Sequence, residues 1–123
     1  MAYLGWELSE AERARLLTLF PPAYPDVVAH HVTKQFGVSE DTPAPDQARF
    51  AVVGVTDDGE KLQTLVVSVD GQTQRPDGET YHVTWSLDRE AGAKPKDSKM
   101  AIKRLGYTVT DRVEFQAEPK TFT

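Results

Sequence analysis

Residues 50–69 read FAVVGVTDDGEKLQTLVVSV, and this stretch carries the clearest information on the fold. Its two ends, 50–56 and 62–69, are rich in β-branched residues, and Asp58-Gly59 lies between them. An Asp-Gly pair between two such runs is a strong signal for a tight β-hairpin. We therefore predict two antiparallel strands here, joined by a short polar turn.

Further strand-like runs lie on both sides of this hairpin. One covers residues 27–36 and ends at Gly37, and another covers residues 81–87. A last strand is predicted over 112–117, with a short partner over 107–109. Together these runs indicate mainly antiparallel sheet structure.

Two helices are predicted in addition. The first opens with Ser9 and Glu12, an S-x-x-E capping box in which each side chain can bond the other residue's backbone N–H, and it ends at the following Pro-Pro pair. The second is short, is capped by Asp97 or Ser98, and ends before Gly106. The order helix, four strands, helix and strand predicts an α+β fold.

Length and composition limit the class of protein. The 123 residues match one compact domain, so we expect residues 1–123 to share a single core. The content of 39% hydrophobic and 27% charged residues is that of an ordinary soluble domain. The absence of cysteine excludes disulfides and thiolate chemistry. Because no apolar run approaches the ~20 residues of a membrane span and the first residues do not resemble a signal peptide, we expect a cytoplasmic protein with no membrane partner.

Charge is unevenly distributed along the chain. The net charge of −5 argues against binding to long duplex nucleic acid. Residues 88–104 nevertheless carry a net charge of +3, which favours a small anionic ligand on an otherwise acidic protein. The basic residues of this segment are Arg89, Lys94, Lys96, Lys99, Lys103 and Arg104, and the acidic ones are Asp88, Glu90 and Asp97.

The three histidines of the chain are unusually placed. His31 begins a His-Val-Thr tripeptide that ends at Thr33, and His82 begins a second one that ends at Thr84. Each copy falls in a strand-like run, where side chains alternate between faces, so each histidine should share a face with its threonine. If the two strands are neighbours in one sheet, these polar faces form a cleft with two imidazoles and two hydroxyls.

The same alternation makes predictions for two neighbouring residues. His30 should point away from His31, to pack or hydrogen-bond on the core side, and Phe36 should lie on the face opposite His31. Lys34 shares the predicted face of His30, which argues against a phosphate contact for it.

Two imidazoles around one anion can divide acid and base work, because the imidazole pKa lies near 6.5. Hydrolysis of a phosphodiester needs a base for the attacking water and an acid for the leaving oxygen. Threonine hydroxyls can donate to the non-bridging phosphate oxygens, where negative charge accumulates. This scheme requires no metal and no other cofactor.

The two His-x-Thr tripeptides resemble the defining motifs of the two-histidine (2H) phosphoesterases. The double histidine, Phe36-Gly37 and the run Lys94-Pro95-Lys96-Asp97-Ser98 are similar to a small RNA-repair branch with RNA ligase-like cyclic phosphodiesterases. Lys34 and Trp85 depart from the family, which usually has an aliphatic residue after each motif.

The resemblance implies a bilobal α+β fold with its cleft between two sheets. It further implies metal-independent hydrolysis of a cyclic phosphate or phosphodiester in a small nucleotide or at an RNA 3′ end. On this basis His31 and His82 would be the catalytic pair, and Thr33 and Thr84 would bind the phosphate.

Several readings stay open. Lys94 and Ser98 are candidate further phosphate contacts at a helix N-terminus, or else a turn residue and a helix cap. Besides a phosphodiesterase, the chain could be a nucleotide- or RNA-end-binding module without turnover, or an interaction domain whose two motifs lie on distant strands. The sequence leaves open the substrate, the bond cleaved, the acid and base roles of the histidines, and the oligomeric state.

Overall fold

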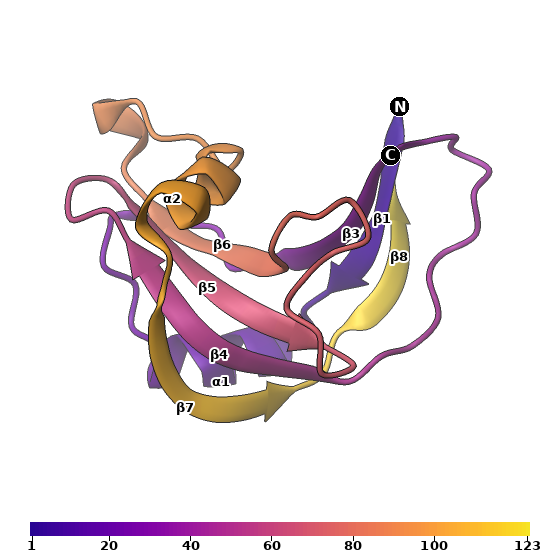
Figure 1. The fold of residues 1–123 in the computed structure, drawn as a ribbon, viewed down its shortest axis with the longest axis horizontal. Coiled ribbons are helices and arrows are strands. Elements are labelled where there is room, and N and C mark those ends of the chain that lie inside the picture. Colours follow the sequence, from indigo (N-terminus) through magenta and orange to yellow (C-terminus); the bar gives the residue numbers. More distant parts are fainter.

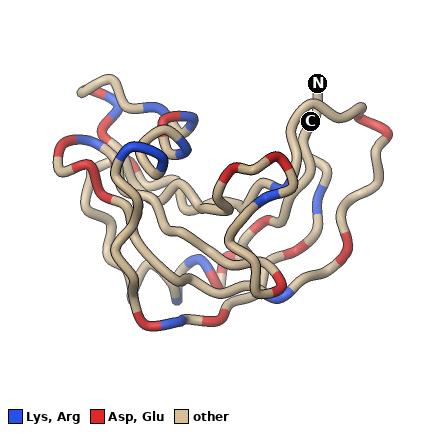
Figure 2. Tube along the Cα trace, in the orientation of Figure 1, with Lys and Arg blue, Asp and Glu red and all other residues tan.

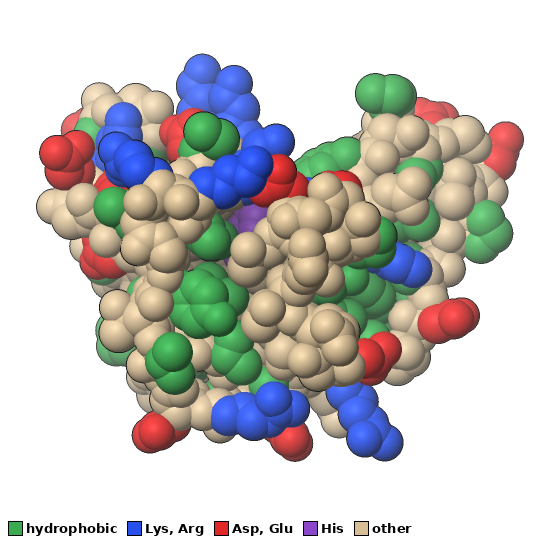
Figure 3. All heavy atoms as spheres, viewed as in Figure 1, with side chains coloured by type: hydrophobic (Ala, Val, Ile, Leu, Met, Phe, Trp, Pro, Cys, Tyr) green, Lys and Arg blue, Asp and Glu red, His purple; other side chains and the backbone are tan.

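Two antiparallel sheets and two α-helices make up the protein, and the computed structural model describes all of residues 1–123. The predicted α+β class is confirmed. The two sheets diverge from a shared base (Figure 1), and the molecular surface is hollowed into a notch between them (Figure 3). The three-stranded sheet has the order β3 (His31–Val38), β1 (Ala2–Glu7), β8 (Glu118–Phe122). The five-stranded sheet has the order β2 (Asp26–Val27), β6 (His82–Leu87), β5 (Leu62–Val69), β4 (Phe50–Asp57), β7 (Thr108–Phe115).

The predicted hairpin forms β4 and β5, which pair antiparallel in the five-stranded sheet. Its turn is held by Asp58, whose Oδ1 accepts the backbone N–H groups of Glu60, Lys61 and Leu62 at 2.9, 2.8 and 3.0 Å. Gly59 takes a positive φ of 76°, which a side chain would oppose. Local turn chemistry therefore accounts for this part of the fold.

Two α-helices cover opposite faces of the five-stranded sheet. α1 (Glu10–Leu19) buries Leu16 in the main core together with Leu65 and Trp85, whereas α2 (Asp97–Leu105) packs Ala101 against a smaller apolar cluster on the other face. A short 3₁₀ turn, η1 (Arg89–Ala91), leads toward α2. No helix is long and apolar enough to cross a membrane.

The helix caps only partly follow the sequence-based prediction. Ser9 caps α1 by accepting the Glu12 N–H at 3.2 Å, as predicted, but the Glu12 carboxylate pairs with Arg15 at 2.8 Å instead of reaching back. The predicted side-chain cap of α2 is wrong: the helix begins after Lys96 without one. The hydroxyl of Ser98 bonds to a neighbouring strand instead.

The predicted continuous strand over 27–36 is wrong. The chain bends at Ala29, a buried residue with φ of 44°, and α1 stabilises the bend through Arg13, whose Nε donates to the Ala29 carbonyl at 3.0 Å. Before the bend β2 pairs with β6, and after it β3 pairs with β1. The two His-Val-Thr strands therefore lie in different sheets and are not neighbours within one.

Two further strands differ from the prediction. β1 was not predicted, although it is the central strand of its sheet, with β3 on one side and β8 on the other. The separate segments predicted over 107–109 and 112–117 are one strand, β7, and the chain then crosses to the other sheet as β8. Both strands are defined by pairing with distant parts of the chain, which short runs of sequence do not reveal.

Candidate active site

A cavity of about 300 Å³ opens at the base of the notch, between β3 of one sheet and β6 of the other. His31, Thr33, His82 and Thr84 all line it. Figure 3 shows this hollow with histidine at its floor and basic side chains along one rim. The structure thus brings both motifs together, across two facing sheets instead of along adjacent strands.

The β3 side of the cavity is shaped by a β-bulge. Gly5 of β1 faces Thr33 and Leu4 faces Gln35, so Lys34 is left over between them. The extra residue reverses the alternation, and Phe36 lines the same cavity as His31. The predicted placement of Phe36 on the opposite face is therefore wrong.

His82 has a single hydrogen-bonding tautomer. Its Nδ1 lies 2.8 Å from the carbonyl oxygen of Thr80, which can only accept, so Nδ1 carries the proton. In the neutral ring Nε2 then holds a lone pair. Burial lowers the pKa of His82, and the Arg75 charge lowers it further, while the Thr80 bond opposes the shift.

His31 contacts a second imidazole. Its Nδ1 lies 2.9 Å from Nδ1 of His30. The prediction that His30 points away from His31 is wrong, because His30 precedes β3 and follows the bend at Ala29, where strand alternation does not apply. Burial lowers the pKa of His31 to about 4, and the charges of His30 and His82 lower it too, while Glu7 opposes them.

The two threonines differ in their surroundings. Thr33 is largely buried and lines the cavity, where its hydroxyl can reach a ligand. Thr84 Oγ1 lies 2.8 Å from Ser98 Oγ and donates to the Pro95 carbonyl at 3.3 Å. Ser98 is fully buried behind Thr84 and does not line the cavity.

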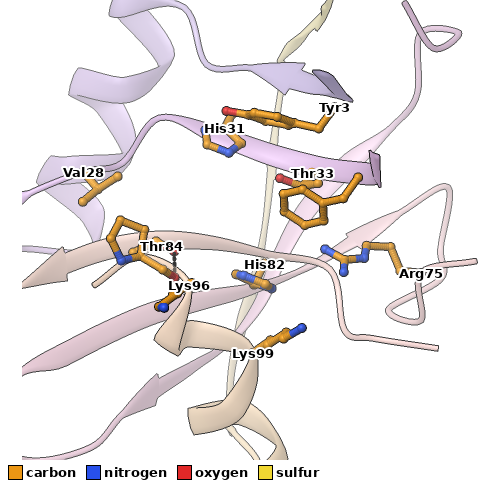
Figure 4. Close-up of a pocket in the computed structure, with 11 residues that line it drawn as sticks. Tyr3, Val28, His31, Thr33, Arg75, His82, Thr84, Lys96 and Lys99 are labelled. Atoms are coloured by element: carbon orange, nitrogen blue, oxygen red, sulfur yellow. Dashed lines mark hydrogen bonds between the residues drawn. The ribbon is translucent and has the colours of Figure 1, made fainter. Parts of the chain in front are cut away.

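Three cationic side chains line the cavity, and no carboxylate does. Lys96 and Lys99 come from the start of α2, and Arg75 comes from the loop between β5 and β6 (Figure 4). Figure 2 shows the concentration of basic residues on α2, beside the notch. Lys94, a predicted candidate, does not line the cavity, and its backbone N–H bonds to Asp97.

The buried Arg75 side chain is held in place by an ion pair and an aromatic ring. Its Nε and Nη2 donate to the Asp77 carboxylate at 3.1 and 2.8 Å, and its guanidinium lies 5.4 Å from the centre of the Phe36 ring. Phe36 is 59% exposed, and Tyr3 packs against it at 5.5 Å between ring centres. Tyr3 and Phe36 thus form an aromatic end of the cavity, next to His31.

Sequence reasoning missed four residues of the cavity and its surroundings: Tyr3, His30, Phe36 and Arg75. Among the cavity residues outside the two motifs, only Lys96 and Lys99 were indicated by the sequence, because they belong to the positively charged segment 88–104. Phe36 enters the cavity through the bulge and Arg75 through the β5–β6 loop, whereas Tyr3 lies on β1, which was not predicted. His30 lies against His31 outside the cavity, after the bend at Ala29, and all four positions depend on tertiary structure.

The arrangement suits a tetrahedral anion. Cations, hydroxyl donors and two imidazoles surround one small space, and the depressed pKa values leave both histidines mainly neutral at pH 7 when no anion is bound. An anion between the rings would favour their protonated forms and raise both pKa values. Nowhere do three or more His, Cys, Asp or Glu side chains gather so as to hold a metal ion.

No family model, no curated protein and no solved structure matches this chain.

Proposed function

We propose that the protein is a 2H-like phosphodiesterase that hydrolyses a cyclic phosphate or phosphodiester of a nucleotide or RNA end. One observation carries the proposal: His31 and His82, from facing sheets, line a single cavity together with two threonines and three cations. Acid and base groups that act on one phosphate must reach it from different sides, and strands in facing sheets provide such positions.

In the proposed reaction one imidazole removes a proton from water as the water oxygen attacks phosphorus. The bond from phosphorus to the ribose oxygen breaks, and the other imidazole, initially protonated, donates its proton to that oxygen. Thr33 and Thr84 donate to the non-bridging oxygens, and Arg75, Lys96 and Lys99 offset the charge that develops there. The histidines end with exchanged protonation states, which solvent restores. No step requires a metal.

The protonated imidazole of this scheme has to arise when substrate binds. Without a bound anion, burial favours the neutral form of both rings, helped by the charges of His30 and His82 at His31 and by the charge of Arg75 at His82. A phosphodiester brings one negative charge between them, which favours uptake of a proton by one ring. The substrate thereby supports the protonation state that its own cleavage needs.

The size of the cavity favours a small substrate. A volume of about 300 Å³ is at the lower end for ligand pockets and fits one nucleotide or the last residue of a single strand. The exposed Phe36 ring, above the Arg75 guanidinium, supports a nucleobase as part of that substrate. A cytoplasmic site of action stays a prediction from the sequence.

The binding module remains the second candidate, because the same features would hold a nucleotide without turnover. The interaction domain with motifs on distant strands loses its premise, since both motifs line one cavity.

Hydrolysis of nucleoside 2′,3′-cyclic phosphates, and of an oligoribonucleotide with a 2′,3′-cyclic end, tests the proposal. We expect turnover by the wild type and a loss of roughly 10²- to 10⁴-fold in both His31→Ala and His82→Ala. Lys94→Gln is the matched control, because Lys94 lies outside the cavity and should leave the rate unchanged. Thermal stabilisation by the cyclic nucleotides without any turnover would identify a binding module instead.

A further inference from the structure

His30 and Glu7 lie behind His31 and outside the cavity, and they have no part in the reaction described above. We propose that they form a positioning pair that holds His31 as its Nδ1–H tautomer, with Nε2 free to act on the substrate. The catalytic consequence rests on the proposed phosphodiesterase function, but the tautomer itself can be observed without it.

The two motif histidines are oriented by different partners. His82 donates its Nδ1–H to the Thr80 carbonyl, and a carbonyl leaves no choice of tautomer. The Nδ1 of His31 faces the Nδ1 of His30 at 2.9 Å, and an imidazole nitrogen can either donate or accept. The tautomer of His31 is therefore decided by whatever sets the proton on His30.

Glu7 sets that proton. Its Oε2 lies 3.7 Å from Nε2 of His30, which is too long for a hydrogen bond but close enough to favour a proton on that nitrogen. The Lys120 ammonium, 2.8 Å from the same oxygen, lowers the Glu7 pKa and keeps the carboxylate charged. With Nε2 of His30 protonated, its Nδ1 carries a lone pair and accepts the Nδ1–H of His31.

Aromatic packing keeps the two rings in this relation. Phe122 of β8 lies 5.0 Å from the His31 ring and 6.1 Å from the His30 ring, between ring centres. Tyr3 of β1 lies 5.4 Å from His31 and stacks on Phe122 at 4.7 Å. Strands on one side of the notch thus clamp the imidazole pair before any ligand is bound.

Titratable groups face His31 from both sides of the cavity. On its own side these are His30, Glu7 and Tyr3, with Lys120 behind Glu7, and across the cavity it is His82. Arg75, Lys96 and Lys99 line the same cavity.

The Nδ1–H tautomer suits either catalytic role. Its Nε2 lone pair can take a proton from water, and after protonation the same nitrogen can donate to the leaving oxygen. The opposite tautomer would present an N–H to the cavity and could not act as a base. Loss of the positioning pair should therefore lower kcat and leave KM nearly unchanged, since neither His30 nor Glu7 lines the cavity.

Side-chain ¹⁵N NMR of the full chain tests the tautomer, together with kinetics on 2′,3′-cyclic nucleotides. We expect Nδ1–H at His31 in the wild type and a shift toward Nε2–H in His30→Ala, with kcat lowered about 10- to 100-fold. His30→Asn offers an amide oxygen near the former Nδ1 position and should restore most of kcat, while Glu7→Gln should give an intermediate loss. Gln35→Ala, exposed on the same strand but outside the cavity, is the matched control and should change neither readout.

Two results would overturn the inference: Nε2–H at His31 in the wild type, or an unchanged tautomer and kcat in His30→Ala. Failure of the proposed function is a separate outcome. If the wild type hydrolyses no cyclic phosphate, the NMR tautomers of wild type and His30→Ala still decide whether His30 positions His31.

Discussion

The hydroxyl of Ser98, fully buried at the start of α2, lies 2.8 Å from the hydroxyl of Thr84 on β6. Thr84 has a second partner, the Pro95 carbonyl, at the longer distance of 3.3 Å. When Ser98 donates to Thr84, the Thr84 proton is available to Pro95 or to a bound phosphate. Ser98 thereby orients a hydroxyl of the cavity without lining the cavity itself.

Removal of the Ser98 hydroxyl should therefore weaken substrate binding and catalysis together. We expect Ser98→Ala to lower kcat/KM several-fold and to cost about 0.5–1.5 kcal/mol of stability, the net worth of one hydrogen bond. Thr84→Val should lower kcat/KM more than Ser98→Ala, because it removes the donor itself. Steady-state kinetics and chemical denaturation measure both effects, and equal losses in the two variants would contradict this order.

Lys96 and Lys99 should contribute to substrate affinity through their charge. We expect either Lys→Gln variant to raise KM about 3- to 10-fold at low salt, as a loss of ~1 kcal/mol implies, and to flatten the dependence of KM on ionic strength. Lys94→Gln is matched in charge change but lies outside the cavity, so its KM and salt dependence should equal those of the wild type. Equal responses at positions 94 and 99 would refute a local contact.

Stability should fall as the solution is acidified through the histidine range. The unfolded histidine binds a proton near pH 6.5, whereas folded His31 does so only at about 4, so the unfolded state holds more protons between these values. His82, whose pKa is also lowered, acts in the same direction. The free energy of unfolding should thus decrease from pH 6.5 toward pH 4, by at most about 1.4 kcal/mol per pH unit for each histidine.

Urea unfolding at a series of pH values measures this slope. His31→Gln should reduce the slope of the unfolding free energy against pH, in the acidic range, by about one bound proton. At pH 7.5 the stability of both proteins should depend less on pH than it does at pH 5. A slope that is identical in wild type and variant would show that His31 titrates normally in the folded protein.

Phosphate binding should be accompanied by proton uptake. Both motif histidines are mainly neutral in the empty cavity at pH 6.5, and an anion between them raises their pKa values. Calorimetric titration with inorganic phosphate in buffers of different ionisation enthalpy reports the number of protons taken up. We expect a positive number beyond the ionisation of phosphate itself, reduced in His31→Gln and in His82→Gln; release of protons would contradict the arrangement.

Gly5 should be intolerant of any side chain. A Cβ at this position would collide with the backbone carbonyl of Val32, across from Thr33 in the cavity wall. We expect Gly5→Ala to destabilise the protein by about 3 kcal/mol or more, since backbone atoms cannot move aside easily. Gly59→Ala, in an open turn with φ of 76°, is the comparison and should cost only about 1–2 kcal/mol. Thermal or chemical denaturation distinguishes the two.

The local elements of the fold follow directly from the sequence. The Asp58-Gly59 turn, the Ser9 cap of α1 and the end of α2 at Gly106 are set by residues close together in the chain, and the structure contains all three. Within each motif, histidine and threonine line the same cavity, because two residues one apart on a strand share a face. Steric limits on the backbone and short-range hydrogen bonds are enough for these features.

Tertiary structure decided how those elements meet. The bend at Ala29 sends the motif of His31 into a different sheet from that of His82, the bulge at Lys34 turns Phe36 into the cavity, and the loop after β5 delivers Arg75. Alternation of side chains holds only within an unbroken strand, and breaks in strands are stabilised by contacts between distant residues, such as Arg13 with the Ala29 carbonyl. The sequence by itself therefore determined which side chains each strand offers, while the packing of two sheets against one core determined which of them face a common space.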